Sequence, residues 1–246
     1  EDWHALVQWC SQQQLYGLEN LALIPGTVGA APMQNIGAYG VEISAFITRL
    51  TVYDTQLVED VIFDHNECDF AYRDSVFKRA PAGRYVITEV ELQLSDEFAA
   101  NLSYAALAAK FDKVPAPTSS QLIEAVCAIR RSKLPDPRLL GNAGSFFKNP
   151  LVSSDKIERL LTQGYKLPHF VTEDADFYRV PAAWLLEEAG WKGRRRGDAA
   201  VHEKHALVLV NLGKASGEDV FLLAQEMSNS VLHKFGIALQ PEVRLI

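Results

Sequence analysis

The chain has 246 residues, of which 48% are hydrophobic and 22% are charged, and its formal net charge is −7. This length suits one large domain or two small ones, and the composition excludes gross disorder. The acidic balance argues against a nucleic-acid-binding protein, because such proteins neutralise phosphates with clustered lysine and arginine. No stretch of about 18 apolar residues occurs, so the sequence predicts no membrane span.

The three cysteines, Cys10, Cys68 and Cys127, lie far apart and lack the CxxC spacing of metal sites. The pattern predicts neither a metal site nor a disulfide framework, and it favours a reducing cytoplasm. The chain opens at Glu1 without an initiator Met or a signal-peptide pattern, so we expect that an upstream part is missing.

Periodicity predicts a first helix that is capped by Asp2 and ends at Gly17. The segment 21–40 fits neither helical nor strand spacing. Strand-like stretches follow at 47–53, 58–63 and 85–94. A helix that begins at Ser119 is broken by Leu134-Pro135-Asp136-Pro137, where two prolines in three residues forbid helix and mark a boundary between lobes.

The second lobe carries patterns for three helices and two strands. We expect helices at 155–161, 182–189 and 216–235, a buried strand at 206–211 and a last strand over 237–246. The whole chain therefore predicts an α+β fold, with domains at 1–134 and 138–236 and a C-terminal strand at 237–246.

The segment Gly141–Pro150, GNAGSFFKNP, combines small residues before Ser145 with two phenylalanines after it. We interpret it as a functional loop, since glycine permits sharp bends and close approach and the aromatic pair would exclude water. The hydroxyl of Ser145, the ammonium of Lys148 and the carboxamide of Asn149 supply a proton donor, a charge and a two-way hydrogen bonder.

The segment 21–40 contains two G-x-x-G pairs, Gly26/Gly29 and Gly37/Gly40, around the polar Gln34 and Asn35. Backbone N–H groups in such loops can surround an anion such as a diphosphate. The spacing is neither GxGxxG nor a Walker A motif. The alternative is an irregular loop packed by its own glycines.

Several single residues have a functional and a structural interpretation. Arg73 is either a bidentate carboxylate binder or a partner of Asp74 or Asp69. Glu242 is either a desolvated carboxylate with a raised pKa, suited to proton transfer, or an exposed edge residue.

The basic and aromatic candidates also have two interpretations. Lys133 is a ligand clamp or a surface residue, and the run 192–196 holds an anion or forms a solvated turn. Tyr104 reads as a half-buried core residue, and His202 and His205 lack a further metal ligand.

Together, six blocks of sequence resemble the UDP-N-acetylenolpyruvoylglucosamine reductase family in its longer form. The blocks are GLENLALIPGTVGAAPMQNIGAYG at 17–40, YRDSVFK at 72–78, KLPDP at 133–137, GNAGSFFKNP at 141–150, AAVHEKHALVLVN at 199–211 and QPEVRLI at 240–246. The resemblance implies a vanillyl-alcohol-oxidase-like FAD-binding region at 1–134 and a substrate-binding domain at 138–236. It also implies that NADPH reduces FAD, which then reduces the enolpyruvyl ether of UDP-N-acetylglucosamine to UDP-N-acetylmuramate for peptidoglycan.

The resemblance assigns proton donation to Ser145, and stabilisation of the intermediate or its carboxylate to Glu242 and Arg73. It implies substrate contacts at Tyr104, Lys133, Asn149, Lys192 and His205, and a FAD cradle that includes Gly26, Gly29, Gln34, Asn35 and Gly37. Two residues depart from the pattern: His205 stands for a glutamine, and Phe170 for a tyrosine that closes over the nucleotide. A glycine-rich FAD motif of the family's upstream lobe has no match.

Two other functions fit the same residues. One is a Ser–Lys hydrolase in which Lys133 or Lys148 activates Ser145, and the other is a UDP-sugar-binding fragment without activity. The reductase interpretation predicts a cytoplasmic monomer that binds neither nucleic acid nor a membrane.

Overall fold

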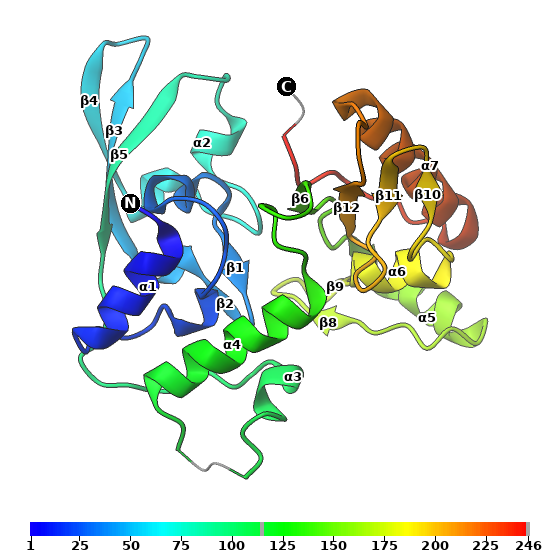
Figure 1. Cartoon of the computed structure of the whole chain (residues 1–246), viewed down its shortest axis with the longest axis horizontal. Helices are drawn as coiled ribbons and strands as arrows, with labels where there is room; N and C mark the ends of the chain where they lie inside the picture. The colour runs from blue at the N-terminus through cyan, green and yellow to red at the C-terminus, as the bar shows by residue number, and fades with distance from the viewer. Residues whose placement is uncertain (114–115, 245–246) are drawn as a thin grey trace. The chain divides into compact units, whose positions relative to one another are not determined.

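A computed structural model describes residues 1–113 and 116–244 of the chain. The chain divides into two compact units, Glu1–Ser132 and Lys133–Ile246 (Figure 1). Each unit combines helices with antiparallel sheet, which confirms the predicted α+β class. No helix in the described ranges has both the length and the apolar character that a membrane span requires.

The first unit is built on a three-stranded antiparallel sheet of order β4-β3-β5. The central strand β3 (Ile47–Asp54) alternates buried and more exposed residues, so Leu50 and Val52 enter the core while their neighbours do not. It pairs with β4 (Glu59–Asp64) and with β5 (Tyr85–Leu92). The three strands confirm the strand-like stretches at 47–53, 58–63 and 85–94, although irregular pairing with β3 interrupts the alternation along β5.

Helix α1 (Trp3–Gln12) begins as predicted, because the Asp2 side chain accepts a hydrogen bond from the Ala5 N–H at 2.8 Å. The prediction that it ends at Gly17 is wrong. Gln14 takes a left-handed conformation with φ 59°, and the Leu15 N–H returns to the Cys10 carbonyl at 2.9 Å. Gly17 instead lies so close to Phe46 that an added Cβ would come within 2.4 Å of the ring.

The glycine-rich segment folds as short 3-10 turns rather than as a regular element. The turns span Glu19–Leu21, Val28–Ala30 and Pro32–Gln34, and a small hairpin of β1 (Gly37–Ala38) and β2 (Val41–Glu42) follows, with another turn at Ile43–Ala45. Further along are a turn at His65–Cys68 and the helices α2 (Val76–Arg79), α3 (Ala105–Ala108) and α4 (Ser119–Lys133). Helix α4 ends where the paired prolines predict.

The second unit contains two small antiparallel sheets. One has the order β10-β11-β12-β6 and the other the order β7-β9-β8. The strands of the first are β6 (Asn142–Ser145), β10 (Arg195–Arg196), β11 (Ala199–Val201) and β12 (Val208–Asn211), and those of the second are β7 (Leu151–Ser153), β8 (Phe170–Val171) and β9 (Phe177–Arg179).

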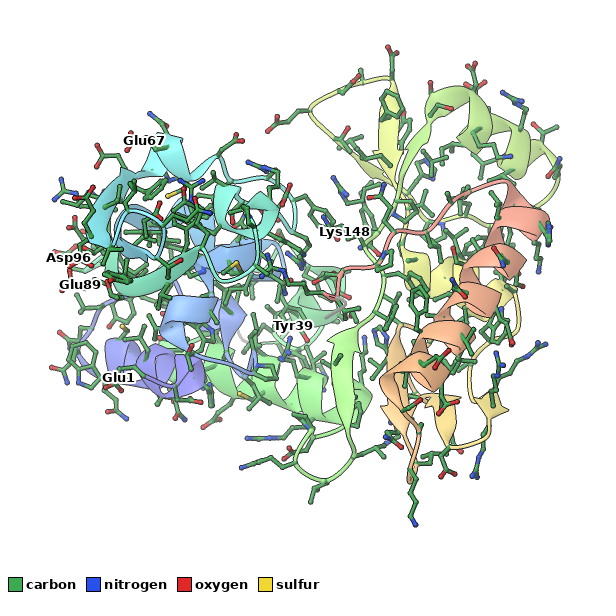
Figure 2. All side chains as sticks on the ribbon, turned by 90° about the horizontal axis from the view of Figure 1, so that it is seen from above. Glu1, Tyr39, Glu67, Glu89, Asp96 and Lys148 are labelled. Atoms are coloured by element: carbon green, nitrogen blue, oxygen red, sulfur yellow. The ribbon has the colours of Figure 1, made fainter. Side chains whose placement is uncertain are left out.

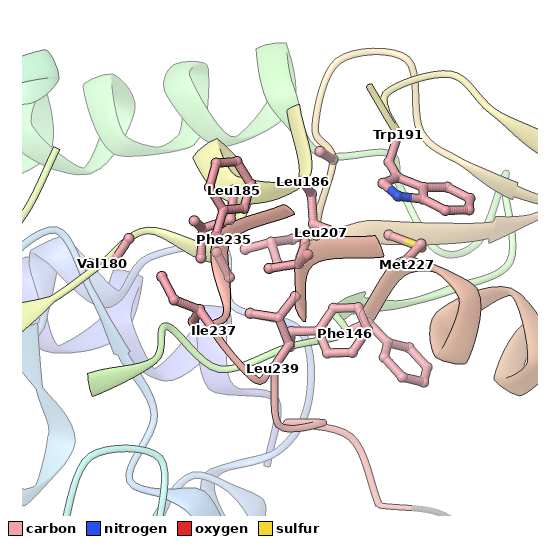
Figure 3. Close-up of a cluster of buried hydrophobic side chains, with 14 of the residues drawn as sticks. Phe146, Val180, Leu185, Leu186, Trp191, Leu207, Met227, Phe235, Ile237 and Leu239 are labelled. Atoms are coloured by element: carbon pink, nitrogen blue, oxygen red, sulfur yellow. The ribbon is translucent and has the colours of Figure 1, made fainter. Parts of the chain in front are cut away.

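Three helices complete this unit: α5 (Ser154–Thr162), α6 (Ala182–Glu188) and α7 (Gly217–Phe235). Helix α7 begins with a capping box in which Ser216 and Asp219 satisfy each other's backbone N–H groups, and it ends at the left-handed Gly236. Its buried face joins one apolar core with α6 and β12 (Figure 3). The three predicted helices are thus confirmed.

Two expectations for this unit are wrong. Residues Asn142–Ser145 are not part of a loop but form the edge strand β6, because backbone pairing with β12 satisfies them. The predicted strand over 237–246 is absent in its described part, 237–244, where a single bridge pairs Pro241 with Phe147. The fixed φ of Pro241 is unfavourable for a long extended ladder, and proline in sheets is confined mainly to edges, strand starts and bulges.

Candidate functional site

The chain returns at its C-terminal end to the segment that carries Ser145. The Glu242 N–H donates a hydrogen bond of 2.8 Å to the carbonyl oxygen of Phe146, and the Lys148 N–H donates one of 2.9 Å to the Gln240 carbonyl. Lys148 lies beside this tail in Figure 2. Glu242 is thereby fixed next to the residue that follows Ser145, although nearly the whole second unit separates them in sequence.

Ser145 and Glu242 are both half-buried, whereas the two phenylalanines between Ser145 and Lys148 are not part of an open pocket. Phe146 is 4% and Phe147 is 2% exposed, and both belong to the core of the second unit (Figure 3). Their predicted role in excluding water from a site stays a prediction, and their burial adds a structural role. They anchor the backbone on both sides of the pairing with the tail.

Asn149 connects the same segment to helix α6. Its Oδ1 accepts a hydrogen bond of 2.9 Å from the N–H of Ala182, the first residue of α6, and its carbonyl accepts one of 3.0 Å from Arg179. A helix N-terminus has N–H groups without partners inside the helix, and Asn149 satisfies one of them. The amide N–H₂ of Asn149 and the second lone pair of its Oδ1 are left for the predicted substrate contact.

Three of the predicted substrate residues lie near one another in the second unit. Burial lowers the pKa of His205, Glu187 acts in the opposite direction, and Lys133, His202 and Lys192 lower it further. The Nδ1 atom of His205 accepts a hydrogen bond from the Leu207 N–H at 3.3 Å, so in the neutral ring the proton lies on Nε2. Lys192 pairs with Glu187 at 3.3 Å. We call Lys133, Lys192 and His205 the basic cluster, although Glu187 pairs with Lys192 and the lowered pKa leaves His205 neutral at pH 7.

In the first unit, Arg73 lies against the glycine-rich segment. Its Nη2 donates to the Gly37 carbonyl at 2.5 Å, its Nη1 lies 3.7 Å from Glu42 Oε1, and its guanidinium stacks over Tyr72. The alternative pairing of Arg73 with Asp74 or Asp69 is wrong, because both carboxylates pair with Arg79.

The predicted cofactor residues differ in what they offer. Asn35 is buried and left-handed, and its side chain bonds to Glu42, to the Ala71 carbonyl and to the Ser44 N–H. Gln34 accepts a bond from Lys78 through Oε1, which directs its amide N–H₂ elsewhere. Gly26 has φ 120°, and nothing lies within 4 Å of the position that a Cβ would take. Its backbone is therefore open to close approach, as binding of a phosphate-bearing cofactor such as FAD requires.

One residue that the sequence pattern assigned only to a helix face is Arg130 on α4. Its guanidinium bonds to the Leu23 carbonyl at 3.1 Å and to the side chain of Tyr39, and burial lowers its pKa. Tyr39 in turn packs edge-on against Tyr104, with ring centroids 5.1 Å apart. Tyr104 is 41% exposed, so it is a boundary residue beside the glycine-rich segment rather than a core residue. The helical spacing of α4 could not identify Arg130 as functional, because a partly buried arginine next to the apolar face fits the same pattern as a structural residue.

The remaining candidates are distributed over the second unit. Phe170 on β8 is 60% exposed. Among the described residues, no hydrogen bond joins the Ser145 hydroxyl to Lys133 or Lys148, so the structure adds no support for a Ser–Lys hydrolase. Among residues 1–113 and 116–244, no group of three His, Cys, Asp or Glu side chains is arranged to hold a metal ion.

Comparison with known proteins adds the family. Residues 136–246 match the family model described as "UDP-N-acetylenolpyruvoylglucosamine reductase, C-terminal domain", and residues 1–56 match the model described as "FAD binding domain". A UDP-N-acetylenolpyruvoylglucosamine reductase of Xylella fastidiosa is 47% identical over 246 residues, which cover 99% of this chain and 70% of that protein. One from Pseudomonas putida is 47% identical and covers 100% of this chain and 72% of its own.

A solved structure of the Thermus caldophilus reductase shares the fold, with a TM-score of 0.64 and 24% sequence identity over 99% of this chain and 69% of that one. The sequence matches extend over both units. The chain therefore belongs to the UDP-N-acetylenolpyruvoylglucosamine reductase family.

Proposed function

We propose that the protein reduces the enolpyruvyl ether of UDP-N-acetylglucosamine to UDP-N-acetylmuramate, with NADPH as reductant and FAD as cofactor. The observation that carries the proposal is the backbone pairing that holds Glu242 beside the Ser145 segment. It supports the proposal because it brings the backbone of Glu242 next to Phe146, the residue after Ser145, in a chain whose relatives are named for this reaction.

FAD, when bound, supplies a carrier that accepts hydride from NADPH and passes it to the vinyl carbon of the substrate. The chain's own contribution begins with Ser145, which donates a proton to the carbon beside the carboxylate. A serine hydroxyl is a poor acid in water, so its proton becomes transferable only where fixed charges stabilise the developing alkoxide.

Two further side chains act on the charge that accumulates on the substrate. Arg73 is held by Gly37 and Glu42, which gives its guanidinium a fixed direction for a carboxylate or an enolate-like oxygen. Glu242, whose backbone N–H bonds to the Phe146 carbonyl, shares this role as a protonated carboxyl group, since its O–H can then donate a hydrogen bond to an anionic oxygen. Side chains that are already held in place lower the activation barrier, because they need little rearrangement to reach the transition state.

The basic cluster of Lys133, Lys192 and His205 is our candidate for the diphosphate of the substrate. Asn149 adds its amide group and Tyr104 an aromatic face. We assign FAD binding to the first unit, through Gly26, Gly29, Gln34, Asn35 and Gly37, and substrate binding to the second.

The same proposal gives the protein a place in peptidoglycan synthesis, and through it in cell-wall biogenesis, cell shape and cell division. We propose that it acts as a monomer in the cytoplasm. The three cysteines support that compartment, because all of them are free and buried.

The test is an NADPH oxidation assay with the enolpyruvyl ether of UDP-N-acetylglucosamine, run with and without added FAD. We expect oxidation that requires both the ether and FAD. A colourless protein that binds UDP-sugars but oxidises no NADPH would contradict the proposal and favour a binding module.

A further inference from the structure

Lys78 lies in the same sequence block as Arg73, on the short helix α2 (Val76–Arg79). The N-cap of this helix is Ser75, whose Oγ accepts from the Lys78 N–H at 3.3 Å. The same hydroxyl donates to the Met33 carbonyl at 2.6 Å, inside the 3-10 turn Pro32–Gln34. Helix α2 is therefore attached to the glycine-rich segment at the residue before Gln34.

The ammonium of Lys78 connects two groups that belong to different parts of the proposed reaction. Its Nζ donates to Gln34 Oε1 at 3.2 Å and to the carbonyl oxygen of Arg73 at 3.3 Å. An ammonium has three N–H donors and no acceptor, so it can hold two oxygens at once. Hydrogen bonds from a charged donor are also stronger than neutral ones.

The hydrogen bond from Lys78 to the Arg73 carbonyl holds a residue whose backbone conformation is unfavourable. Arg73 has φ 55°, a left-handed conformation that a bulky side chain rarely adopts and that persists only where its surroundings enforce it. The hydrogen bond from Lys78 helps to hold the carbonyl group of Arg73 in this conformation. The hydrogen bond to the Gly37 carbonyl holds the guanidinium of Arg73.

The bond to Gln34 fixes the direction of a carboxamide. A cation beside an amide selects the oxygen, so the N–H₂ group of Gln34 is turned away from Lys78 and is presented as a donor. Without the ammonium, the amide can rotate by half a turn and offer an acceptor in the same place.

We propose that Lys78 is a positioning residue of the reductase, which fixes the Arg73 backbone and the amide direction of Gln34 through its ammonium. The inference rests on the proposed function, because it concerns how the carboxylate-binding arginine and the flavin cradle are set relative to each other within the first unit.

The neighbouring residue offers a matched control. Arg79 lies on the same helix and forms ion pairs with Asp69 and Asp74, at 2.8 Å for the latter. A change of Arg79 to Met removes a cation and its hydrogen bonds from α2 without touching Gln34 or the Arg73 carbonyl. Effects that come only from a weakened helix should be the same in both variants.

The experiment compares Lys78→Met, Lys78→Arg and Arg79→Met with the unaltered 246-residue protein. Flavin affinity is measured by fluorescence titration, the bound flavin by its absorption spectrum, and the folded state by thermal unfolding without flavin. We expect Lys78→Met to weaken flavin binding by about 10- to 100-fold and to shift the spectrum, as loss of charge-assisted hydrogen bonds implies. Lys78→Arg should restore part of the affinity, because it keeps a cation but not the point geometry of the ammonium.

Steady-state kinetics separate this role from a purely structural one. We expect Lys78→Met to lower kcat with the enolpyruvyl substrate, and Arg79→Met to change neither kcat nor the spectrum. If Lys78→Met does not fold, Lys78→Arg carries the test, and it must shift the flavin spectrum at a native melting temperature. Flavin affinity, spectrum and kcat equal to those of Arg79→Met would overturn the inference and leave the proposed function intact. Absence of flavin binding by the unaltered protein would overturn both.

Discussion

The guanidinium of Arg73 occupies the space that a side chain at residue 37 would need. A Cβ added to Gly37 would lie 2.7 Å from Arg73 Nη1 and 3.1 Å from the Val41 carbonyl oxygen. The absence of a side chain at Gly37 thus lets Arg73 reach the backbone of the glycine-rich segment and bond to its carbonyl. Glycine is required here by close approach rather than by backbone freedom.

Gly37→Ala should therefore impair Arg73 without abolishing the fold. The new methyl group has to displace the guanidinium, and a misplacement of this kind can lower activity by about 10²-fold. The measurement is kcat/KM with the enolpyruvyl substrate. Gly217→Ala is the control, since nothing lies within 4 Å of its added Cβ in α7. Equal activity of the two variants would contradict the role given to Arg73.

Ser145→Ala should separate the two halves of the reaction. We expect NADPH to reduce the bound flavin at the normal rate, while reduction of the enolpyruvyl ether falls by about 10²–10⁴-fold, the scale of a positioned general acid. Stopped-flow absorbance follows each half separately. Ser153→Ala is the control, because Ser153 precedes α5 without a capping bond from its side chain. An unchanged second half-reaction in Ser145→Ala would exclude proton donation by this hydroxyl.

Two substitutions of Asn149 should differ in their effect on stability and agree in their effect on binding of UDP. Asn149→Ala removes the acceptor for the Ala182 N–H and should lower the free energy of unfolding by about 1 kcal/mol. Asn149→Asp keeps an acceptor oxygen at the start of α6 and should retain that stability.

Both Asn149→Ala and Asn149→Asp should weaken the binding of UDP. Asn149→Asp replaces the amide N–H₂ by a negative oxygen, so it should weaken binding of UDP, measured by calorimetry, at least as much as Asn149→Ala. The exposed Asn229 on α7 supplies a control, and Asn229→Ala should change stability by less than about 0.5 kcal/mol. Normal UDP affinity in Asn149→Asp would argue against a phosphate contact here.

The stability of the folded protein should depend on His205 below neutral pH. Burial and the nearby Lys133 and Lys192 lower the pKa of His205 below its ordinary value of 6.5, against the opposing effect of Glu187. The folded state therefore binds this proton less readily than the unfolded state. Its contribution to stability is complete above pH 6.5 and decreases as the pH falls from there through the lowered pKa.

His205→Gln removes this dependence and should lose less stability than the unaltered protein between pH 7 and pH 5. Urea unfolding at a series of pH values provides the measurement, and the two curves should run parallel above pH 8. A loss of stability that is equally steep in both proteins would show that His205 titrates at the same pH in the folded and unfolded states.

The sequence predicts those elements whose signals are local. Caps and apolar spacing locate α1, α4 and α7, and strand-like residue patterns locate β3, β4 and β5. The paired prolines locate the end of α4. The helix end at Gln12 was missed because Gln14, a residue without turn preference, adopts the left-handed conformation that the pattern reserved for glycine.

The site depends on contacts that no local pattern contains. The strand character of Asn142–Ser145 comes from pairing with β12, more than sixty residues away, and the small residues resemble those of a loop. The basic cluster likewise gathers Lys133, Lys192 and His205 from three separate elements. The family resemblance names these residues as candidates, but only the folded chain places Lys133 and Lys192 close enough to act on the pKa of His205.

The tail is held to the Phe146–Lys148 segment by main-chain hydrogen bonds on either side of the Phe147–Pro241 pair, so proline occupies the one position whose N–H is not needed. Such an attachment is indifferent to side-chain identity. Substitutions at Gln240 or Glu242 should therefore leave the register of the tail unchanged, and the place of the Glu242 carboxyl along the Phe146–Lys148 segment follows from that register.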